Sequence, residues 1–211
     1  MKKTIIFFTI ILAVFATYAQ SSYGTEVTGD QKTALVSAIE KAHSQLSTLS
    51  ANFTQEKTSS LMTDKVVQKG KLRYKSPKQL RWEYTSPKAM AVIFTDGKVL
   101  LKTDKGNVNN PNKILNEMGS LIINTINGSF LKENKDFKVT YYKNAKNSKV
   151  IVKLVPLNKR IKAYYSKMVI ELDGNTHLAD KVAMHEVNGD ITTITFSDKK
   201  SNGTIPEDVF K

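Results

Sequence analysis

Residues 70–87 contain two runs that alternate between hydrophobic and polar side chains, with a turn at Pro77 between them. Successive side chains of a β-strand point to opposite faces, so this period of two predicts a pair of antiparallel strands with one apolar face. The polar positions are mostly Lys and Arg, which suit a solvated face. A sheet of this kind must cover its apolar face with helices, a second sheet or a ligand. The apolar face is predicted to carry Leu72, Tyr74, Leu80, Trp82 and Tyr84.

The N-terminus has the pattern of a secretion signal. Lys2 and Lys3 precede an apolar run over residues 5–16, and small residues then lead up to Ala19. We predict a signal peptide over residues 1–19 with cleavage after Ala19, so that the mature chain is exported. An uncleaved anchor is the alternative, but the apolar run is shorter than the roughly 18 residues that a membrane span needs.

Removal of the first 19 of the 211 residues leaves 192, which is enough for one domain with its own core. We expect residues 20–28 to form a flexible leader and residues 29–211 to form this domain. The formal charge is +13, or +11 once Lys2 and Lys3 are removed. The basic residues are scattered, which indicates a solvated surface and is compatible with weak attraction to anionic lipids or an acidic partner. The sequence has no motif for reading nucleic acid.

The sequence has no cysteine, which excludes disulfides, thiol catalysis, cysteine metal sites and the acylated cysteine of a bacterial lipoprotein. The three histidines are His43, His177 and His185, and none has the spacing of a metal-binding pair such as His-x-x-x-His. We interpret His185 and the adjacent Glu186 as a surface pair rather than a catalytic site. We therefore predict no catalytic residue, no metal and no cofactor, and hence a protein that is not an enzyme.

The rest of the hydrophobic pattern divides into two helices and many short strands. Apolar residues at helical spacing predict helices over residues 30–46 and 111–126, the second ending at Asn127-Gly128. Closely spaced turn signals separate about ten strands, which predicts an antiparallel, meandering sheet. The predicted fold class is mainly β with two or three helices (α+β): a curved antiparallel sheet that forms an incomplete β-barrel closed by helices, with an apolar cavity between them. Strands are predicted over residues 51–57, 66–74, 79–85, 89–95, 99–103, 137–142, 150–155, 167–172, 179–186 and 191–197.

An ordered set of short motifs runs through the chain. Two of its members are residues 170–173 and 202–210 in the C-terminal half. The others, in the N-terminal half, are Phe53-Thr54-Gln55, Gly70-Lys71-Leu72, Lys75-Ser76-Pro77, Leu80-Arg81-Trp82-Glu83-Tyr84, Pro87 and Thr95-Asp96-Gly97-Lys98. With these motifs in this order, the chain resembles the LolA family of periplasmic outer-membrane lipoprotein carriers over nearly all of its mature length.

The resemblance implies a periplasmic carrier that shields lipoprotein acyl chains in an apolar cavity and ferries them from the inner to the outer membrane. Its implied partners are lipoproteins, an inner-membrane lipoprotein-releasing ABC transporter and an outer-membrane acceptor, either a receptor or the membrane. The carrier itself is expected to be a monomer. A lipid- or lipoprotein-sensing interaction module on the same half-barrel is the alternative function.

Two departures from the family pattern bear on the mechanism. Ser76 stands at the turn position where the family has an arginine implicated in holding the lid closed. That role is not transferred to Ser76, and Lys75 or Arg73 are the candidates to replace the arginine. We also expect no counterpart of the family's C-terminal extension after Phe210.

The apolar face has two interpretations, ordinary core packing and a cavity for acyl chains. The resemblance and the small number of covering helices favour the cavity, because apolar and aromatic side chains line such sites in barrel mouths. The second helix is the candidate lid. The predicted cavity residues are Phe53, Leu72, Tyr74, Leu80, Trp82, Tyr84 and Ile93, and the predicted lid residues are Ile114, Met118, Leu121, Ile122 and Ile126.

Overall fold

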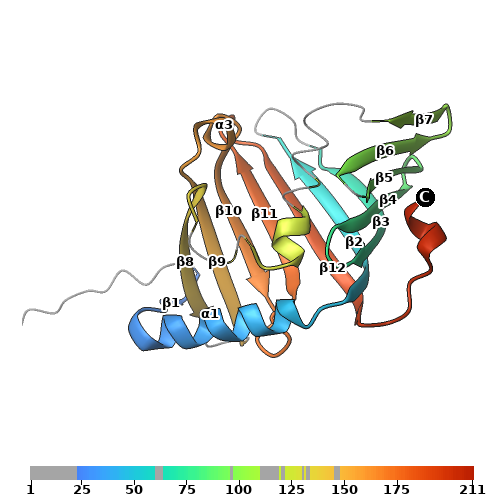
Figure 1. Cartoon of the computed structure of the whole chain (residues 1–211). Coiled ribbons are helices and arrows are strands. Elements are labelled where there is room, and N and C mark those ends of the chain that lie inside the picture. Colours follow the sequence, from blue (N-terminus) through green and yellow to red (C-terminus); the bar gives the residue numbers. More distant parts are fainter. Residues whose placement is uncertain are drawn as a thin grey trace, which may run out of the picture.

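The computed structural model describes residues 23–59, 64–95, 97–109, 119, 122–129, 131, 134–144 and 148–211. Twelve strands of this part form one antiparallel sheet (Figure 1). The helices with assigned bounds are α1 (Gly29–Ser44), α3 (Lys159–Lys162) and the 3-10 helix η1 (Glu207–Phe210). The strands are β1 (Thr25–Glu26), β2 (Thr48–Thr58), β3 (Val66–Lys75), β4 (Gln79–Ser86), β5 (Met90–Thr95), β6 (Lys98–Thr103), β7 (Gly106–Asn109), β8 (Phe137–Asn144), β9 (Lys149–Pro156), β10 (Tyr165–Leu172), β11 (Ala179–Glu186) and β12 (Ile191–Ser201).

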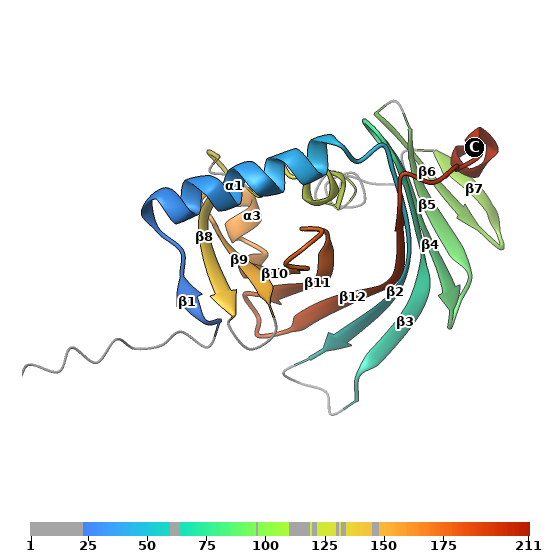
Figure 2. The ribbon, with the colours of Figure 1, turned by 90° about the horizontal axis from the view of Figure 1, so that it is seen from below.

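The order of the strands follows from short connections along the chain. Strands β2 to β7 are neighbours in sequence order, as are β8 to β12, and β12 pairs with β2 to join the two series. The sheet is strongly curved, as Figure 2 shows, and it is not closed, since β1 and β7 lie at its two ends. The predicted incomplete barrel, mainly β with a few helices, is therefore confirmed.

The register of β3 and β4 confirms the face predicted from the period of two. Leu72 lies opposite Trp82, and Tyr74 lies opposite Leu80. All four side chains are buried in the core cluster on the concave side of the sheet. At the next position on this face Gly70 is required, because a Cβ there would lie 2.3 Å from the ring of Phe53.

Helix α1 lies across the concave side of the sheet at one end (Figure 2). Its buried side chains, Leu35, Ile39 and His43, recur every four residues and therefore share one face of the helix. The helix begins after Thr28 rather than at Asp30, which lies in its first turn instead. Within the described residues, no helix is both long and apolar enough to cross a membrane.

The structure contains elements that the sequence pattern did not predict. Strand β1 lies inside the segment predicted as a flexible leader, where it pairs with β8, and Val27 beside it is buried. Strand β7, helix α3 and helix η1 are four residues long each, too short to show a periodic pattern. Of the predicted second helix, residues 122–126 are described and helical, and residues 111–118 lie outside the described part of the chain.

Candidate functional site

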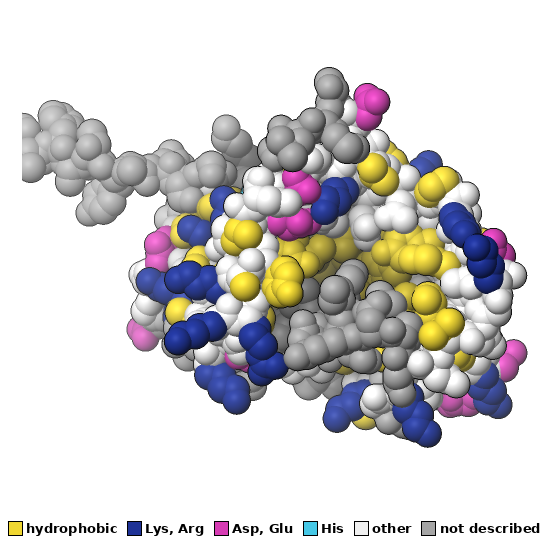
Figure 3. Space-filling model, turned by 90° about the horizontal axis from the view of Figure 1, so that it is seen from above, with side chains coloured by type: hydrophobic (Ala, Val, Ile, Leu, Met, Phe, Trp, Pro, Cys, Tyr) yellow, Lys and Arg dark blue, Asp and Glu magenta, His cyan; other side chains and the backbone are white. Residues whose placement is uncertain are grey.

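A cavity lies between the concave face of the sheet and the helical residues. Its empty space is about 1070 Å³, including the solvent at its mouth. The mouth is visible as a hollow with a hydrophobic floor in Figure 3, on the end of the molecule that carries α3. Almost all of its walls are apolar. The lining residues are His43, Leu49, Ala51, Gln55, Leu72, Trp82, Tyr84, Met90, Val92, Phe94, Gly119, Ile122, Thr125, Ile126, Leu178, Ala179, Val182, Met184, Ile194, Phe196 and Lys199.

Three aromatic rings from two strands, Trp82, Tyr84 and Phe196, line the cavity, and the ring of Phe53 from a third strand packs against them. The rings of Phe53 and Trp82 are stacked, with their centroids 4.1 Å apart. Phe196 meets the Trp82 ring edge-on at 6.2 Å, and Tyr84 meets the Phe53 ring edge-on at 5.4 Å. Such contacts fix the rings in place, so this wall offers a rigid hydrophobic surface.

The predicted cavity residues divide into three groups. Leu72, Trp82 and Tyr84 line the cavity directly. Phe53, Tyr74 and Leu80 belong to the same core cluster on the concave side, but they are not among the lining residues.

The assignment of Ile93 to the cavity is wrong. Ile93 lies opposite Arg81 in the register of β4 and β5, and its neighbours Val92 and Phe94 line the cavity instead. On the outer face, Ile93 shares a smaller hollow with Phe210 of η1. Strand β5 is buried on both faces, so its hydrophobic pattern does not reveal which side chains point inward.

A short chain of polar groups crosses the apolar wall. The hydroxyl of Tyr84 donates to Oε1 of Gln55 at 3.2 Å, and Nε2 of Gln55 donates to Oε1 of Gln68 at 3.0 Å. Burial raises the pKa of the Tyr84 hydroxyl, so this group stays neutral at ordinary pH. The described residues of this wall therefore include hydrogen-bonding groups but no carboxylate.

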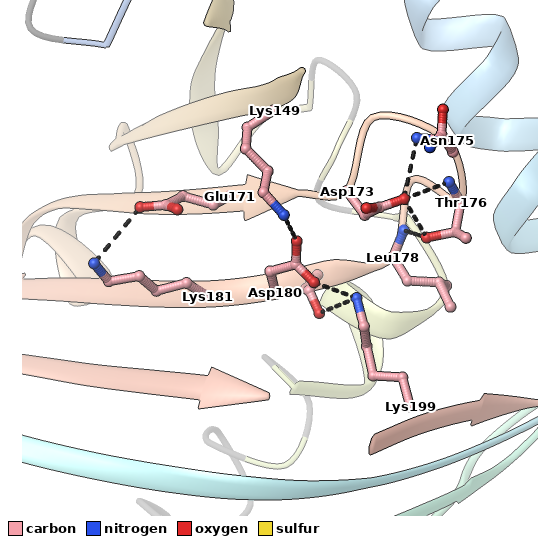
Figure 4. A network of polar contacts seen from close by, with 10 residues as sticks. Lys149, Glu171, Asp173, Asn175, Thr176, Leu178, Asp180, Lys181 and Lys199 are labelled. Carbon is pink, nitrogen blue, oxygen red and sulfur yellow. Dashed lines mark hydrogen bonds and ion pairs between the residues drawn. The ribbon is translucent and has the colours of Figure 1, made fainter. Parts of the chain in front are cut away.

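Among the described lining residues, Lys199 is the one lysine, and a carboxylate holds it. Lys199 donates to Asp180, which also accepts from Lys149 (Figure 4). Burial alone would raise the pKa of Asp180, but the hydrogen bonds from Lys149 and Lys199 outweigh it and lower that pKa. Asp180 is thus ionised and fixes the ammonium of Lys199 at the edge of the cavity.

The described part of the candidate lid contributes to the lining of the cavity. We call helical residues 122–126 the lid segment; Ile122 and Ile126 in it line the cavity. Gly119, just before it, lies so close to Phe94 that a Cβ would be 1.8 Å from that ring. The other predicted lid residues, Ile114, Met118 and Leu121, lie outside the described residues.

His43 joins three elements at the cavity wall, and it was not predicted as a site residue. The residue is only 6% exposed, and its Nδ1 lies 2.5 Å from the carbonyl oxygen of Ile126. Its Nε2 is 3.1 Å from the carbonyl oxygen of His177, in the turn between β10 and β11. The carboxylate of Asp173 orders this turn by accepting the backbone N–H of Thr176 at 2.8 Å (Figure 4).

Ser76 and its basic neighbours bond to residues outside the lid segment. Ser76 is exposed in the turn between β3 and β4, and its backbone N–H donates to the carbonyl of Ser47 at 2.8 Å. Lys75 pairs with Glu207 of η1, and Arg73 donates to the carbonyl of Leu72. Within the described residues, neither of these cations bonds to the lid segment.

The remaining titratable groups do not assemble a metal or acid–base site in the described part of the chain. No cluster of His, Asp and Glu side chains there could hold a metal ion. Glu186, next to His185, pairs instead with Lys57 at 3.0 Å. The arrangement offers a hydrophobic binding surface with helical residues beside it.

Comparison with known proteins agrees with this architecture. Residues 44–211 match the family model described as "Outer membrane lipoprotein carrier protein LolA". No sequence match to a curated protein was found. The crystal structure of MucB is similar with a TM-score of 0.51 at 11% identity, over 87% of this chain and 63% of that chain.

Two further solved structures are less similar. A LolA superfamily protein from Nitrosomonas europaea gives a TM-score of 0.44 at 9% identity, over 85% of this chain and 97% of that chain. The lipoprotein LppX from Mycobacterium tuberculosis gives 0.41 at 9% identity, over 82% of this chain and 98% of that chain. The family match covers most of the sequence, and the chain therefore belongs to the LolA family of outer membrane lipoprotein carrier proteins.

Proposed function

We propose that this protein is a periplasmic carrier that shields the acyl chains of lipoproteins and ferries them from the inner to the outer membrane. The observation that carries the proposal is the apolar cavity between the concave sheet and the lid segment. The signal over residues 1–19 would direct export and then be removed. Loading by an inner-membrane ABC transporter and delivery to an outer-membrane acceptor complete the proposed route.

The energetics of acyl chains suit such a cavity. Each methylene removed from water contributes about 0.8 kcal/mol, so a chain of about a dozen carbons gains roughly 10 kcal/mol. The rings of Trp82 and Phe196, supported by the ring of Phe53 stacked on Trp82, supply a preformed surface for this burial. Binding and release then need only opening of the cover, and the protein acts as a carrier and not as an enzyme.

Native mass spectrometry of the protein purified from the periplasm tests this proposal. We expect a bound species whose mass equals that of a lipoprotein with its acyl chains. Phe196→Glu places a charge in the cavity wall and should abolish this species, whereas Thr195→Glu, on the exposed opposite face of β12, should not.

The same experiment separates the carrier from a lipid-sensing module. A bound diacyl or triacyl lipid without protein agrees with either function, so transfer must then be measured. Passage of a labelled lipoprotein from the loaded protein to acceptor membranes supports the carrier. Retention of the lipoprotein by a loaded, folded protein would contradict it.

A further inference from the structure

Three large hydrophobic side chains are exposed at the end of the molecule where the cavity opens. Leu157 is 56% exposed, Tyr164 is 61% exposed and Val187 is 60% exposed. Hydrophobic and basic side chains gather beside the hollow on this face in Figure 3. Single exposed hydrophobic residues are common, but several of this size on one rim indicate an interaction surface.

The backbone holds these three side chains in a fixed frame. Leu157 immediately precedes Asn158, the N-cap of α3, and Tyr164 follows the C-cap Ala163. The backbone N–H of Val187, in the turn between β11 and β12, donates to the carbonyl of Tyr164 at 3.0 Å. The N–H of Leu157 donates to the carbonyl of Asp136 at 2.7 Å. Binding through these side chains therefore requires no further ordering of the backbone that carries them.

Basic side chains surround these hydrophobic ones. Lys159, Arg160 and Lys162 of α3 are exposed, as is Lys135 before β8. None of these four has an ion-pair partner in the part of the chain that the structure describes. We call the three hydrophobic and four basic residues together the rim patch.

The nearby carboxylates are already engaged. Asp136 accepts a hydrogen bond from the side chain of Asn158 at 2.8 Å. Glu186 and Asp190 both pair with Lys57, at 3.0 and 3.4 Å. Among the described residues, these three carboxylates stand against five cations, the four of the rim patch and Lys57, so the α3 side of the mouth keeps a net positive charge.

We propose that the rim patch docks the cavity mouth on the surface of an anionic lipid bilayer. Exposed aromatic and aliphatic side chains can enter the head-group region, and the lysines and arginine attract anionic lipids. A hydrophobic rim with a net positive charge suits such a surface, because its hydrophobic side chains can enter the head-group region and its cations attract the anionic lipids. Docking would place the mouth against the bilayer. Acyl chains would then pass between membrane and cavity with little exposure to water, an inference that rests on the proposed function.

Vesicle flotation of the empty protein tests the docking. We expect binding to vesicles of phosphatidylcholine and phosphatidylglycerol in equal parts, weak binding to pure phosphatidylcholine, and weaker binding as salt rises. One charge near an anionic surface contributes about fivefold to binding, so Lys159→Gln/Lys162→Gln should weaken it by roughly twentyfold. The matched control is Lys78→Gln/Lys200→Gln, two exposed lysines at the α1 end of the sheet.

The hydrophobic part of the patch has its own matched pair. Val187→Ser should weaken vesicle binding at every salt concentration, whereas Val108→Ser, 48% exposed on β7, should leave it unchanged. Thermal unfolding of each variant verifies that it is folded. Cargo binding is measured separately by acyl-chain quenching of Trp82, so loss of docking with intact quenching leaves the proposed carrier function standing.

Three results would overturn the docking proposal. Equal loss for the two lysine pairs would show a general effect of net charge. Equal binding to neutral and anionic vesicles would remove the role of the basic residues. A wild-type protein that binds neither kind of vesicle would exclude the membrane and leave an acidic protein surface as the occupant of the rim patch.

Discussion

The imidazole of His43 lies 2.5 Å from the carbonyl oxygen of Ile126, although the two residues are on different helices. This contact joins α1 to the C-terminal end of the lid segment at the cavity wall. The second ring nitrogen is 3.1 Å from the carbonyl oxygen of His177. A neutral imidazole has one N–H, so it can donate to only one of these carbonyls, whereas the charged ring can donate to both.

Replacing His43 should loosen the lid segment. We expect His43→Leu, which keeps a bulky side chain but removes the hydrogen bonds, to cost about 1 kcal/mol of local closure. Backbone amides of residues 122–128 should then exchange hydrogen about fivefold faster. Ser44→Ala on the same helix is the control, because its hydroxyl bonds only within α1. Unchanged exchange in His43→Leu would show that packing alone holds the segment.

Acidification should destabilise the protein through two histidines. The pKa of His177 is lowered mainly by burial and, to a lesser extent, by the nearby charge of His43. The pKa of His185 is lowered mainly by burial and, to a lesser extent, by the charge of Lys167. The unfolded chain therefore takes up protons first, and stability is lost as the pH falls below the ordinary histidine value of about 6.5. Urea unfolding at about pH 7.5 and about pH 5.5 should show lower stability at the acidic value.

The variant His177→Asn identifies the source of this pH dependence. Asn tolerates the positive φ of 55° at this position and does not titrate. The loss of stability between the two pH values should become smaller in the variant. An unchanged loss would show that His177 does not contribute to the pH dependence.

Gly70→Ala should strain the sheet behind the aromatic wall. Its Cβ would lie 2.3 Å from the ring of Phe53 and 2.1 Å from the backbone oxygen of Glu83. Overpacking of this kind costs about 1 to 3 kcal/mol in the free energy of unfolding, which chemical denaturation measures. Gly203→Ala is the control, because a Cβ there meets no atom within 4 Å. Equal stability of the two variants would contradict the close packing at Gly70.

Ile93→Ala separates stability from binding. Ile93 is buried on the outer face, so its truncation should lower the free energy of unfolding by about 2 to 5 kcal/mol. Acyl-probe binding per folded molecule should stay at the wild-type level, because the neighbours Val92 and Phe94 line the cavity instead. Weaker binding at unchanged stability would show that the side chain of Ile93 contributes to the cavity wall.

The hydrophobic pattern predicted much of the architecture, because a half-buried strand shows its period directly. All ten predicted strands are present, and the face carrying Leu72 and Trp82 is the one that forms the cavity. Strands β1 and β7 were missed, since two and four residues are too few for a period to emerge.

The site was harder to predict than the fold. His43 follows Leu35 and Ile39 at intervals of four, a signal that could have placed it on the buried face of α1. Its partners, the carbonyls of Ile126 and His177, are far away in the sequence and meet it only through the folded sheet. The sequence does not show which backbone carbonyls accept hydrogen bonds from distant side chains, so contacts of this kind are visible only in the structure.

The central claim is that acyl chains enter the cavity, and contact quenching of the single tryptophan tests it most directly. Trp82 is the only tryptophan in the sequence and lines the cavity. A lipid with brominated acyl chains should quench its fluorescence at saturating, stoichiometric binding in the wild type and in Thr195→Glu. In Phe196→Glu, the fluorescence with the brominated lipid should equal the fluorescence of the same variant without lipid. Wild-type fluorescence that the brominated lipid leaves unchanged would contradict the account.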